Sequence, residues 1–225
     1  MTDLPVFTTQ NGVASLTLRE IPYKKNAYIK IQDSRDPFLL LMDCVNFCRS
    51  VGAKFIYASG HPVLEQYPLY TEIWRMAAPR ERLPATDTTV YPVTPQTLEE
   101  WRQLYNARMA GVPNASHMTL LEGREMIKRG DGCFVYRGSS LLGIGMARED
   151  TIHAVVTVRP GVGRDVVLTL NQMLSGDRVY LEVASANTRA IRLYTGLGFE
   201  KIEELSKWYK VFDPDKEKYL TNYWM

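Results

Sequence analysis

The 225-residue chain lacks the features that mark a membrane, secreted or nucleic-acid-binding protein. Its longest aliphatic run, Phe38 to Met42, is far shorter than the roughly 20 apolar residues that cross a bilayer. The first five residues contain neither a basic segment nor an apolar one, so no signal peptide is expected. The net charge is only +2 and no basic run stands out, which argues against nucleic acid as a partner.

Cysteine and histidine are scarce and scattered. Three cysteines in a chain of this length do not make a disulfide framework. The expected compartment is therefore the reducing cytoplasm. Cys44 and Cys48 are interpreted as buried apolar groups, because no histidine or second cysteine pair accompanies them. His61, His117 and His153 lack the spacing of metal ligands, so no metal site is predicted.

The residues that are present suit a globular α/β protein with two parts. Apolar residues make up 45% of the chain and charged residues 23%. A polar segment with two prolines, residues 77–90, predicts a linker between a smaller α/β lobe (1–86) and a second domain (87–225). In the first lobe the pattern predicts strands at 13–18, 27–31 and 54–58, a helix from Pro37 to Gly52, and a helix or strand at 69–76.

The second domain has a longer series of alternating strands and helices. Thr94 with Pro95 at the next position predicts a helix start, and glycines at 111 and 130 predict two helix ends. The expected strands are 91–93, 133–136, 141–147, 152–158, 179–183, 199–204 and 208–212, and the last two helices are expected at 163–174 and 187–197. The order indicates a mixed sheet covered by helices.

The most informative stretch is the strand Leu181-Glu182-Val183 with the helix that follows it. Asn187, Ala190, Ile191 and Tyr194 stand at i, i+3, i+4 and i+7, so they share one helical face. An amide, a small residue and a phenol are unusual on a plain core face. Gly198 and Phe199 then end the helix and begin a new strand.

The spacing N-x-x-A-x-x-L-Y-x-x-x-G-F resembles the second half of the GNAT N-acetyltransferase fold, and the resemblance covers about residues 88–212. It implies a GNAT-like acyl-CoA N-acyltransferase fold and transfer of acetyl from acetyl-CoA to a primary amine by direct attack in a ternary complex. Residues 1–86 resemble a degenerate half of such a domain, without its motifs. The alternative is a non-catalytic acyl-CoA-binding or structural GNAT-like module.

A glycine-containing turn before the helix at 163 suits an anion. Glycines let main-chain N–H groups converge, and a helix start adds partial positive charge. The family's Arg/Gln-x-x-Gly-x-Gly/Ala loop grips the CoA pyrophosphate, which implies cofactor contacts from Gly161, Val162, Gly163 and Arg164. A later glycine is replaced by Asp165 and its neighbour, so an ordinary tight turn stays an alternative.

Further cofactor contacts follow from the same resemblance. The strand before the glycine turn splays from its neighbour in this fold and pairs with the pantetheine arm, which implies the main chain of Val156 and Val158. Asn187 either bonds the cofactor or caps the helix that it begins. A buried central strand is the alternative to the splay.

The expected chemistry needs a base for an ammonium with a pKa of about 10.4 and a donor for a thiolate whose acid has a pKa of about 8.5. Tyr194 is the predicted donor; with a phenol pKa of about 10, proton transfer is uphill by roughly 2 kcal/mol. Glu182 is the predicted base, on a sheet face opposite its apolar neighbours. This pair, twelve residues apart, resembles the ribosomal-protein N-terminal acetyltransferase branch. A covered face would raise the pKa of the carboxyl.

Several alternatives and partners remain to be decided by structure. Glu149, Asp150 and His153 are the other candidates for the base, and a solvent-facing Glu182 is the ordinary reading of that residue. The amine acceptor, a small molecule or a peptide, is expected near 112–117 and 206–210. The aromatic tail, 219–225, should dock on its own chain or on a partner, which leaves a homodimer open.

Overall fold

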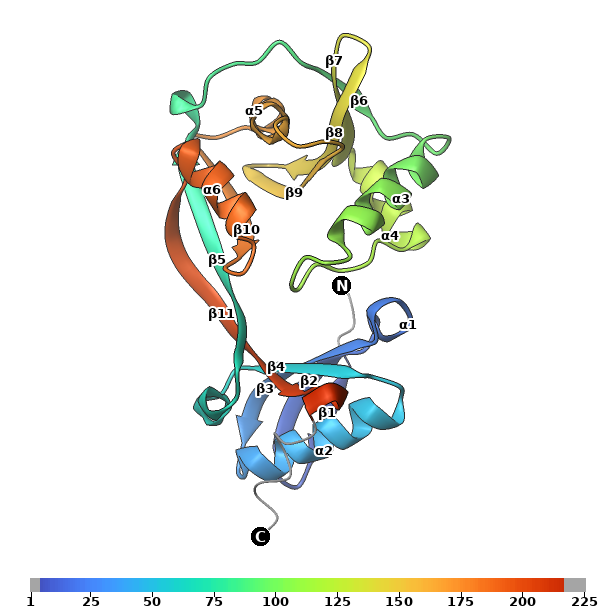
Figure 1. The fold of residues 1–225 in the computed structure, drawn as a ribbon, viewed down its shortest axis with the longest axis vertical. Helices are drawn as coiled ribbons and strands as arrows, with labels where there is room; N and C mark the ends of the chain where they lie inside the picture. Colours follow the sequence, from blue (N-terminus) through green and yellow to red (C-terminus); the bar gives the residue numbers. More distant parts are fainter. Residues whose placement is uncertain (1–4, 217–225) are drawn as a thin grey trace. The chain divides into compact units, whose positions relative to one another are not determined.

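The computed structural model describes residues 5–216, and the chain divides into two compact units (Figure 1). Unit 1 joins the N-terminal segment up to Glu72 with the segment from Leu205 onward, and unit 2 is Ile73–Glu204. The expected lobes 1–86 and 87–225 divide the chain differently. The difference arises because two long strands, β5 (Leu69–Pro79) and β11 (Glu200–Phe212), each run from one unit into the other.

Unit 1 is a small sheet with one long helix. In hydrogen-bonded order its strands are β1, β2, β3, β4 and the C-terminal part of β11. The pairs β1–β2 and β2–β3 are antiparallel, whereas β3 and β4 are parallel and are joined by α2. The bounds are β1 Val6–Thr9, β2 Gly12–Thr17, α1 Ile21–Lys24, β3 Asn26–Ser34, α2 Pro37–Ser50, β4 Phe55–Ser59, η1 Pro62–Gln66 and, near the C-terminus, η3 Pro214–Lys216.

The helix α2 covers one face of this sheet. Its start follows the expected rule, because Pro37 occupies the first helical position and the Asp36 carboxylate caps the main chain. The cysteines Cys44 and Cys48 lie fully buried on its inner side, as interpreted from the sequence. Burial raises the pKa of both thiols to about 12, so neither is a ready metal ligand.

Unit 2 carries a larger sheet in the order β11, β5, β10, β9, β8, β7, β6. From β5 to β6 in this order, neighbouring strands are antiparallel except for β9 and β10, which are parallel and joined by α5. The bounds are η2 Arg80–Arg82, β6 Thr89–Pro92, α3 Leu98–Met109, α4 Leu120–Arg129, β7 Gly132–Arg137, β8 Ser140–Arg148, β9 Thr151–Thr157, α5 Gly163–Met173, β10 Arg178–Ala184 and α6 Thr188–Gly196.

Helices cover both faces of the unit 2 sheet (Figure 1). On one face α5 and α6 pack on β10, β9 and β8 through residues such as Val166, Leu170 and Leu181. On the other face α3 and α4 pack through Trp101 and Met126. The α5–α6 face is the larger core, so the motif identified from the sequence is part of the main packing layer of this unit.

Three local expectations are wrong. The helix α3 starts at Leu98 rather than after Thr94, because Thr94 and Thr97 close a turn through their own hydroxyls. The segment 77–90 is not all linker: buried alanines 77 and 78 continue β5. The two strands expected at 199–204 and 208–212 are one continuous strand, β11.

In the part of the chain that the structure describes, the longest helices are too short or too polar to span a bilayer. The aromatic tail, 219–225, lies outside the described residues.

Candidate functional site

The two parallel strands of unit 2 part soon after they meet. The strand β9 pairs with β10 only at Thr151 with Tyr180 and at Ile152 with Leu181. Beyond these two pairs, β9 continues to Thr157 and β10 to Ala184 without further pairing to each other. The splay expected for this strand is therefore present, and the alternative of a fully paired central strand is wrong.

The register of β9 decides which main-chain groups face the opening. The N–H of Val158 donates to the carbonyl of Leu142 at 3.0 Å, on the β8 side. Because main-chain direction alternates along a strand, Val156 also faces β8, where it lies opposite Ile144. Val156 and Val158 are therefore wrong as pantetheine partners, and the groups that face β10 belong to Val155 and Thr157.

The phase of this alternation is set by a bulge that the sequence did not reveal. Met146 lies opposite Ala154 and Ala147 opposite Ile152, so His153 is the extra residue in β9. The bulge moves every later residue of the strand by one position. Counting positions without it places the wrong pair of residues at the open edge.

The turn after β9 leads into a helix whose start has no side-chain cap. Gly161 has φ +89°, a conformation that favours glycine, and Val162 is the N-cap residue without a side-chain hydrogen bond. A Cβ on Gly163 would stand 2.9 Å from Leu193 Cδ2, so the first turn of α5 lies close against α6. The first main-chain N–H groups of α5 therefore have no side-chain oxygen as an acceptor at the N-cap.

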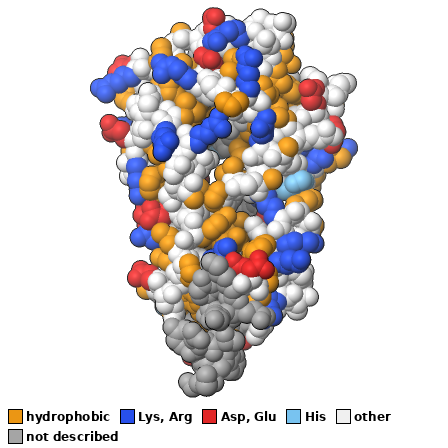
Figure 2. All heavy atoms as spheres, viewed as in Figure 1, with side chains coloured by type: hydrophobic (Ala, Val, Ile, Leu, Met, Phe, Trp, Pro, Cys, Tyr) orange, Lys and Arg blue, Asp and Glu red, His pale blue; other side chains and the backbone are white. Residues whose placement is uncertain are grey.

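Charges around this turn favour an anion. Arg159 and Arg164 are exposed, and Arg108, at the end of α3, donates from Nη2 to the carbonyl of Val158 at 2.7 Å. The negative charge of Asp165 disfavours a nearby phosphate, but Arg137 pairs with it at 3.0 Å. Figure 2 shows Lys and Arg side chains over the visible region of α5 and α6. The contribution of Arg108 was missed because it comes from a distant helix.

A pocket of about 580 Å³ opens on the sheet face opposite α5 and α6, where β9 and β10 meet. It combines carboxylates, a guanidinium, an imidazole, a phenol and one exposed aliphatic side chain, that of Ile202. Its lining residues are Arg75, Asp150, Thr151, Ile152, His153, Tyr180, Leu181, Glu182 and Ile202. A small ligand with both polar and apolar parts fits such a lining.

Solved structures match the chain over most of its length, although no family model and no curated protein matches its sequence. A functionally unknown conserved protein from Staphylococcus epidermidis has a TM-score of 0.58 and 13% identity, over 93% of this chain and 94% of that one. A GCN5-related N-acetyltransferase from Kribbella flavida has a TM-score of 0.53 and 15% identity, over 94% and 90%. A tandem GNAT protein from the clavulanic acid biosynthesis pathway has 0.51 and 12%, over 88% and 78%.

The chain has a GNAT-like fold. The mixed α/β sheet expected from the sequence is confirmed, together with the helices on both of its faces in unit 2.

Tyr194 lies in the core of this GNAT-like unit. It is 8% exposed, and its ring centroid is 5.8 Å from that of Phe199. Burial raises the pKa of the phenol to about 12. Ala190 and Ile191 pack against the same cluster, so the helical face assigned to the cofactor is also a core face.

Glu182 lies on a strand and Asn187 at a helix start, as expected from the sequence, but the surroundings of Glu182 differ from the expected ones. Glu182 points into the pocket, yet its side chain is 56% exposed and its carboxylate stands 3.7 Å from Arg75 Nη2. The covered environment expected for Glu182 is therefore wrong, because α5 and α6 lie on the other face and the α3–α4 core contains no residue of β10. Asn187 caps α6: its Oδ1 accepts from the N–H of Ala190 at 3.2 Å.

The other candidates for the base are now separated. His153 and Asp150 line the pocket with Glu182, whereas Glu149 is not among the lining residues and its side chain is 81% exposed. Partial burial, and then the charge of Arg148, lower the pKa of His153 from 6.5. His153 is thus mostly neutral at pH 7, the form that accepts a proton.

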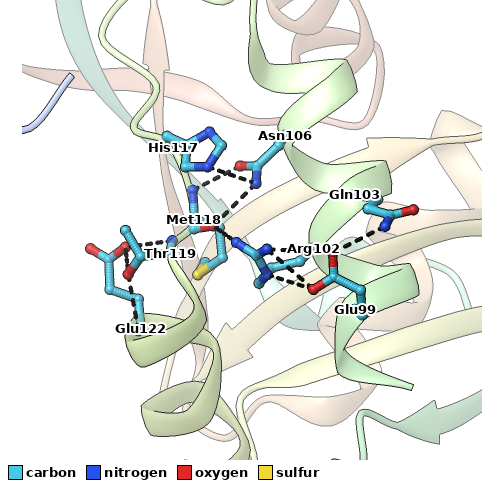
Figure 3. Close-up of polar contacts among 8 residues, drawn as sticks. All are labelled: Glu99, Arg102, Gln103, Asn106, His117, Met118, Thr119 and Glu122. Carbon is cyan, nitrogen blue, oxygen red and sulfur yellow. Dashed lines mark hydrogen bonds and ion pairs between the residues drawn. The ribbon is translucent and has the colours of Figure 1, made fainter. Parts of the chain in front are cut away.

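A polar network holds the segment before α4, which was expected to approach the acceptor (Figure 3). Asn106 Oδ1 accepts from the N–H of Met118 at 2.8 Å, and its Nδ2 donates to the Met118 carbonyl at 3.1 Å and contacts His117 Nε2 at 3.3 Å. Arg102 donates to the same carbonyl at 2.7 Å. Thr119 and Glu122 form a reciprocal capping box. The segment is therefore anchored at its α4 end.

The remaining expected contacts are structural. Trp208 makes an edge contact with Tyr28 at 5.4 Å, and Tyr209 packs against the unit 1 core. Both residues belong to unit 1. No group of three or more His, Cys, Asp or Glu suited to a metal ion occurs among residues 5–216.

Proposed function

We propose that this protein is an N-acetyltransferase that transfers acetyl from acetyl-CoA to a primary amine by direct attack. The observation that carries the proposal is the parting of β9 from β10 after two paired residues, next to an uncapped helix start. The opening offers unpaired strand edges, and the helix start offers main-chain N–H groups to a diphosphate. The GNAT acetyltransferases among the structural neighbours support the same chemistry.

The co-substrate is proposed to lie along the open edge of β9. The diphosphate is held by the N–H groups of the turn from Gly161 to Arg164, with Arg108 and Arg159 nearby. The pantetheine arm pairs with the main chain of Val155 and Thr157, the residues that face the opening. This assignment replaces Val156 and Val158 and keeps the four residues of the turn.

Tyr194 is proposed to act as a hydrogen-bond donor to the departing sulfur. With a pKa of about 12, against about 8.5 for a thiol, full proton transfer is uphill by about 3.5 units, or about 5 kcal/mol. A hydrogen bond to developing negative charge in a dry site costs no such transfer. Burial thus weakens Tyr194 as an acid and strengthens its bond to a thiolate.

The proton of the attacking amine is proposed to leave through the pocket. Glu182 and His153 both line it, and each can take the proton directly or through water. Glu182 carries the family resemblance, and the lowered pKa of His153 favours its neutral form. The acid limb of the pH profile distinguishes them: the base is the residue whose replacement by glutamine removes that limb.

A non-catalytic acyl-CoA-binding module is the second candidate function. The observation that favours it is the packing of Tyr194 and Ile191 into the core, which is what a purely structural helix would show. Under this alternative the turn and the open edge bind the acyl-CoA, and no amine is consumed.

Two measurements in sequence test the proposal. Thermal unfolding with acetyl-CoA at about 100 times its dissociation constant should add roughly 2.7 kcal/mol of stability. Thiol release is then followed with a panel of primary amines. Binding with amine-dependent release supports the enzyme, and binding without release with any amine supports the module. Absence of binding overturns both.

A further inference from the structure

The pocket at the β9–β10 junction has an apolar wall between its charged ends. Ile202 forms this wall and is 47% exposed although it is a large apolar side chain, whereas the side chains of Ile152 and Leu181 pack into the α5–α6 core on the other face. Asp150 and Glu182 are its two carboxylates. An alkyl chain that carries ammonium groups matches this alternation of apolar and acidic surface.

The charge of the lining is negative once the ion pairs are counted. Arg75 is the one cation among the lining residues, and it lies between two carboxylates, 3.7 Å from Glu182 and 3.0 Å from Glu203. These three side chains together keep one negative charge, and Asp150 adds another. Cationic ligands are therefore favoured over neutral ones, and anionic ligands are disfavoured.

Two other arginines act on His153 and do not reverse this balance. Arg148 stands 3.6 Å from Asp131 and 3.7 Å from Glu149, and Arg129 stands 2.6 Å from Asp131. These carboxylates offset their charges.

The two acidic ends of the pocket are separated along the strand direction. Thr151 pairs with Tyr180, so Asp150 lies one residue before this pair and Glu182 two residues after it. Three residues of strand span about 10 Å. The Asp150 carboxylate is fixed by the Thr151 hydroxyl, which donates to Oδ1 at 2.8 Å. One end therefore adjoins the proposed base, and the other offers a fixed acceptor for a second cation.

We infer that the acceptor is a small diamine or polyamine: one amine reacts beside Glu182 and His153, and a second ammonium is held by Asp150. The inference rests on the proposed function and narrows its substrate class. It excludes free amino acids, whose carboxylate would meet the acidic lining.

A matched series of acceptors tests this inference. Butane-1,4-diamine, 4-aminobutan-1-ol and 4-aminobutanoate share the reacting amine and differ at the far end by a positive, neutral or negative group. We expect kcat/KM to fall in that order, with about five- to tenfold between the diamine and the amino alcohol. Asp150→Asn should remove this difference, and Asp150→Glu should keep it.

Glu204→Gln is the control, because Glu204 lies on β11 outside the pocket lining and pairs with Lys201 at 3.6 Å. It changes the net charge as Asp150→Asn does, and it should preserve the preference for the diamine. Equal kcat/KM for the diamine and the amino alcohol overturns the inference while the acetyltransferase function stands.

Calorimetry without acetyl-CoA distinguishes a failure of the diamine inference from a failure of the proposed acetyltransferase function. The diamine should bind the wild-type protein about five- to tenfold more tightly than the amino alcohol, and this difference should vanish in Asp150→Asn. If no acceptor is acetylated, the proposed function fails. The calorimetric preference for the diamine then tests only whether Asp150 binds a cation. Equal binding of both compounds overturns the inference.

Discussion

The two units contain the same local arrangement, a hairpin followed by strand, helix and parallel strand, with opposite outcomes at the junction. In unit 1, β3 and β4 pair over five residues, from Asn26 with Phe55 to Lys30 with Ser59. In unit 2, β9 and β10 pair at two positions and then part. Only the second arrangement leaves strand edges that a ligand can use.

The starts of α2 and α5 also differ, because only α2 has a side-chain cap. Asp36 caps α2, and its carboxylate accepts from the N–H groups of Phe38 and Leu39 at 3.1 and 3.0 Å. The helix α5 has Val162 at the corresponding position and no side-chain cap. The first N–H groups of α2 therefore have a carboxylate acceptor from their own chain, whereas those of α5 have no side-chain cap.

The comparison shows that one supersecondary unit can be fully paired and capped, as in unit 1, or open at its strand edges and helix start, as in unit 2. Full strand pairing and a self-capped helix stabilise unit 1 but leave no place for an acyl-CoA. Unit 2 forgoes both contributions at the point where the ligand is proposed to bind. The following predictions test this contrast, beginning with the largest expected effect.

Val162→Asp gives α5 the acidic cap residue of unit 1. The carboxylate would repel a diphosphate and compete for its N–H groups, so the Kd for acetyl-CoA should rise about 100-fold, or about 2.7 kcal/mol. Titration calorimetry measures this change. Val162→Ile, which stays apolar and cannot cap the helix, should change Kd by less than about threefold. Unchanged affinity of a folded Val162→Asp variant would place the diphosphate elsewhere.

Tyr194→Phe removes one buried hydroxyl from the unit 2 core. Loss of a donor to the departing sulfur should lower kcat by about 10- to 100-fold and leave the Kd for acetyl-CoA within about twofold. Tyr28→Phe in unit 1 is the matched control, because burial also raises the pKa of Tyr28 to about 12. If both variants keep the wild-type kcat, Tyr194 is a packing residue.

Asp36→Ala removes the cap that closes the helix start in unit 1. The free energy of unfolding should fall by about 1 kcal/mol, because two main-chain N–H groups lose their acceptor. Urea denaturation measures the loss, and Asp36→Asn should retain most of the stability. The Kd for acetyl-CoA should not change; a marked loss of affinity would mean that unit 1 takes part in binding.

His153 gives the smallest expected effect, a pH dependence of stability. Its folded pKa lies below 6.5, so the unfolded chain takes up a proton first and stability falls as the pH drops below about 6.5. The side chain is only partly buried and largely accessible to solvent, so screening should keep the effect under about 0.5 kcal/mol. Denaturation at pH 7 and pH 5 should show a smaller loss for His153→Gln than for wild type. An equal loss of stability in the variant and the wild type contradicts the lowered pKa of His153 in the folded protein.

Much of the fold was predictable because local patterns and packing agree. Strong helix boundaries, such as Asp36-Pro37 at the start of α2 and Gly130 at the end of α4, are set by capping and backbone conformation that a few neighbouring residues determine. The uncapped glycine turn before α5 could likewise be seen in Gly161 and Gly163, since no Ser, Thr, Asp or Asn precedes the helix.

The errors occur where distant parts of the chain decide. The bulge at His153 arises from the register with β8, and it shifts the open edge from Val156 and Val158 to Val155 and Thr157. The exposure of Glu182 depends on the packing of α3 and α4, whose core contains no residue of β10, and its partner Arg75 lies more than 100 positions away in the sequence.

The amino-acid sequence by itself determined the order of elements, the uncapped turn and the Glu182–Tyr194 spacing, because these depend on neighbouring residues. Only the tertiary structure decided which edge of β9 is open, that Tyr194 is buried, and that Asp150, His153 and Glu182 share a pocket. Register, burial and electrostatic environment are properties of strands and helices brought together from distant positions, and no local pattern specifies them.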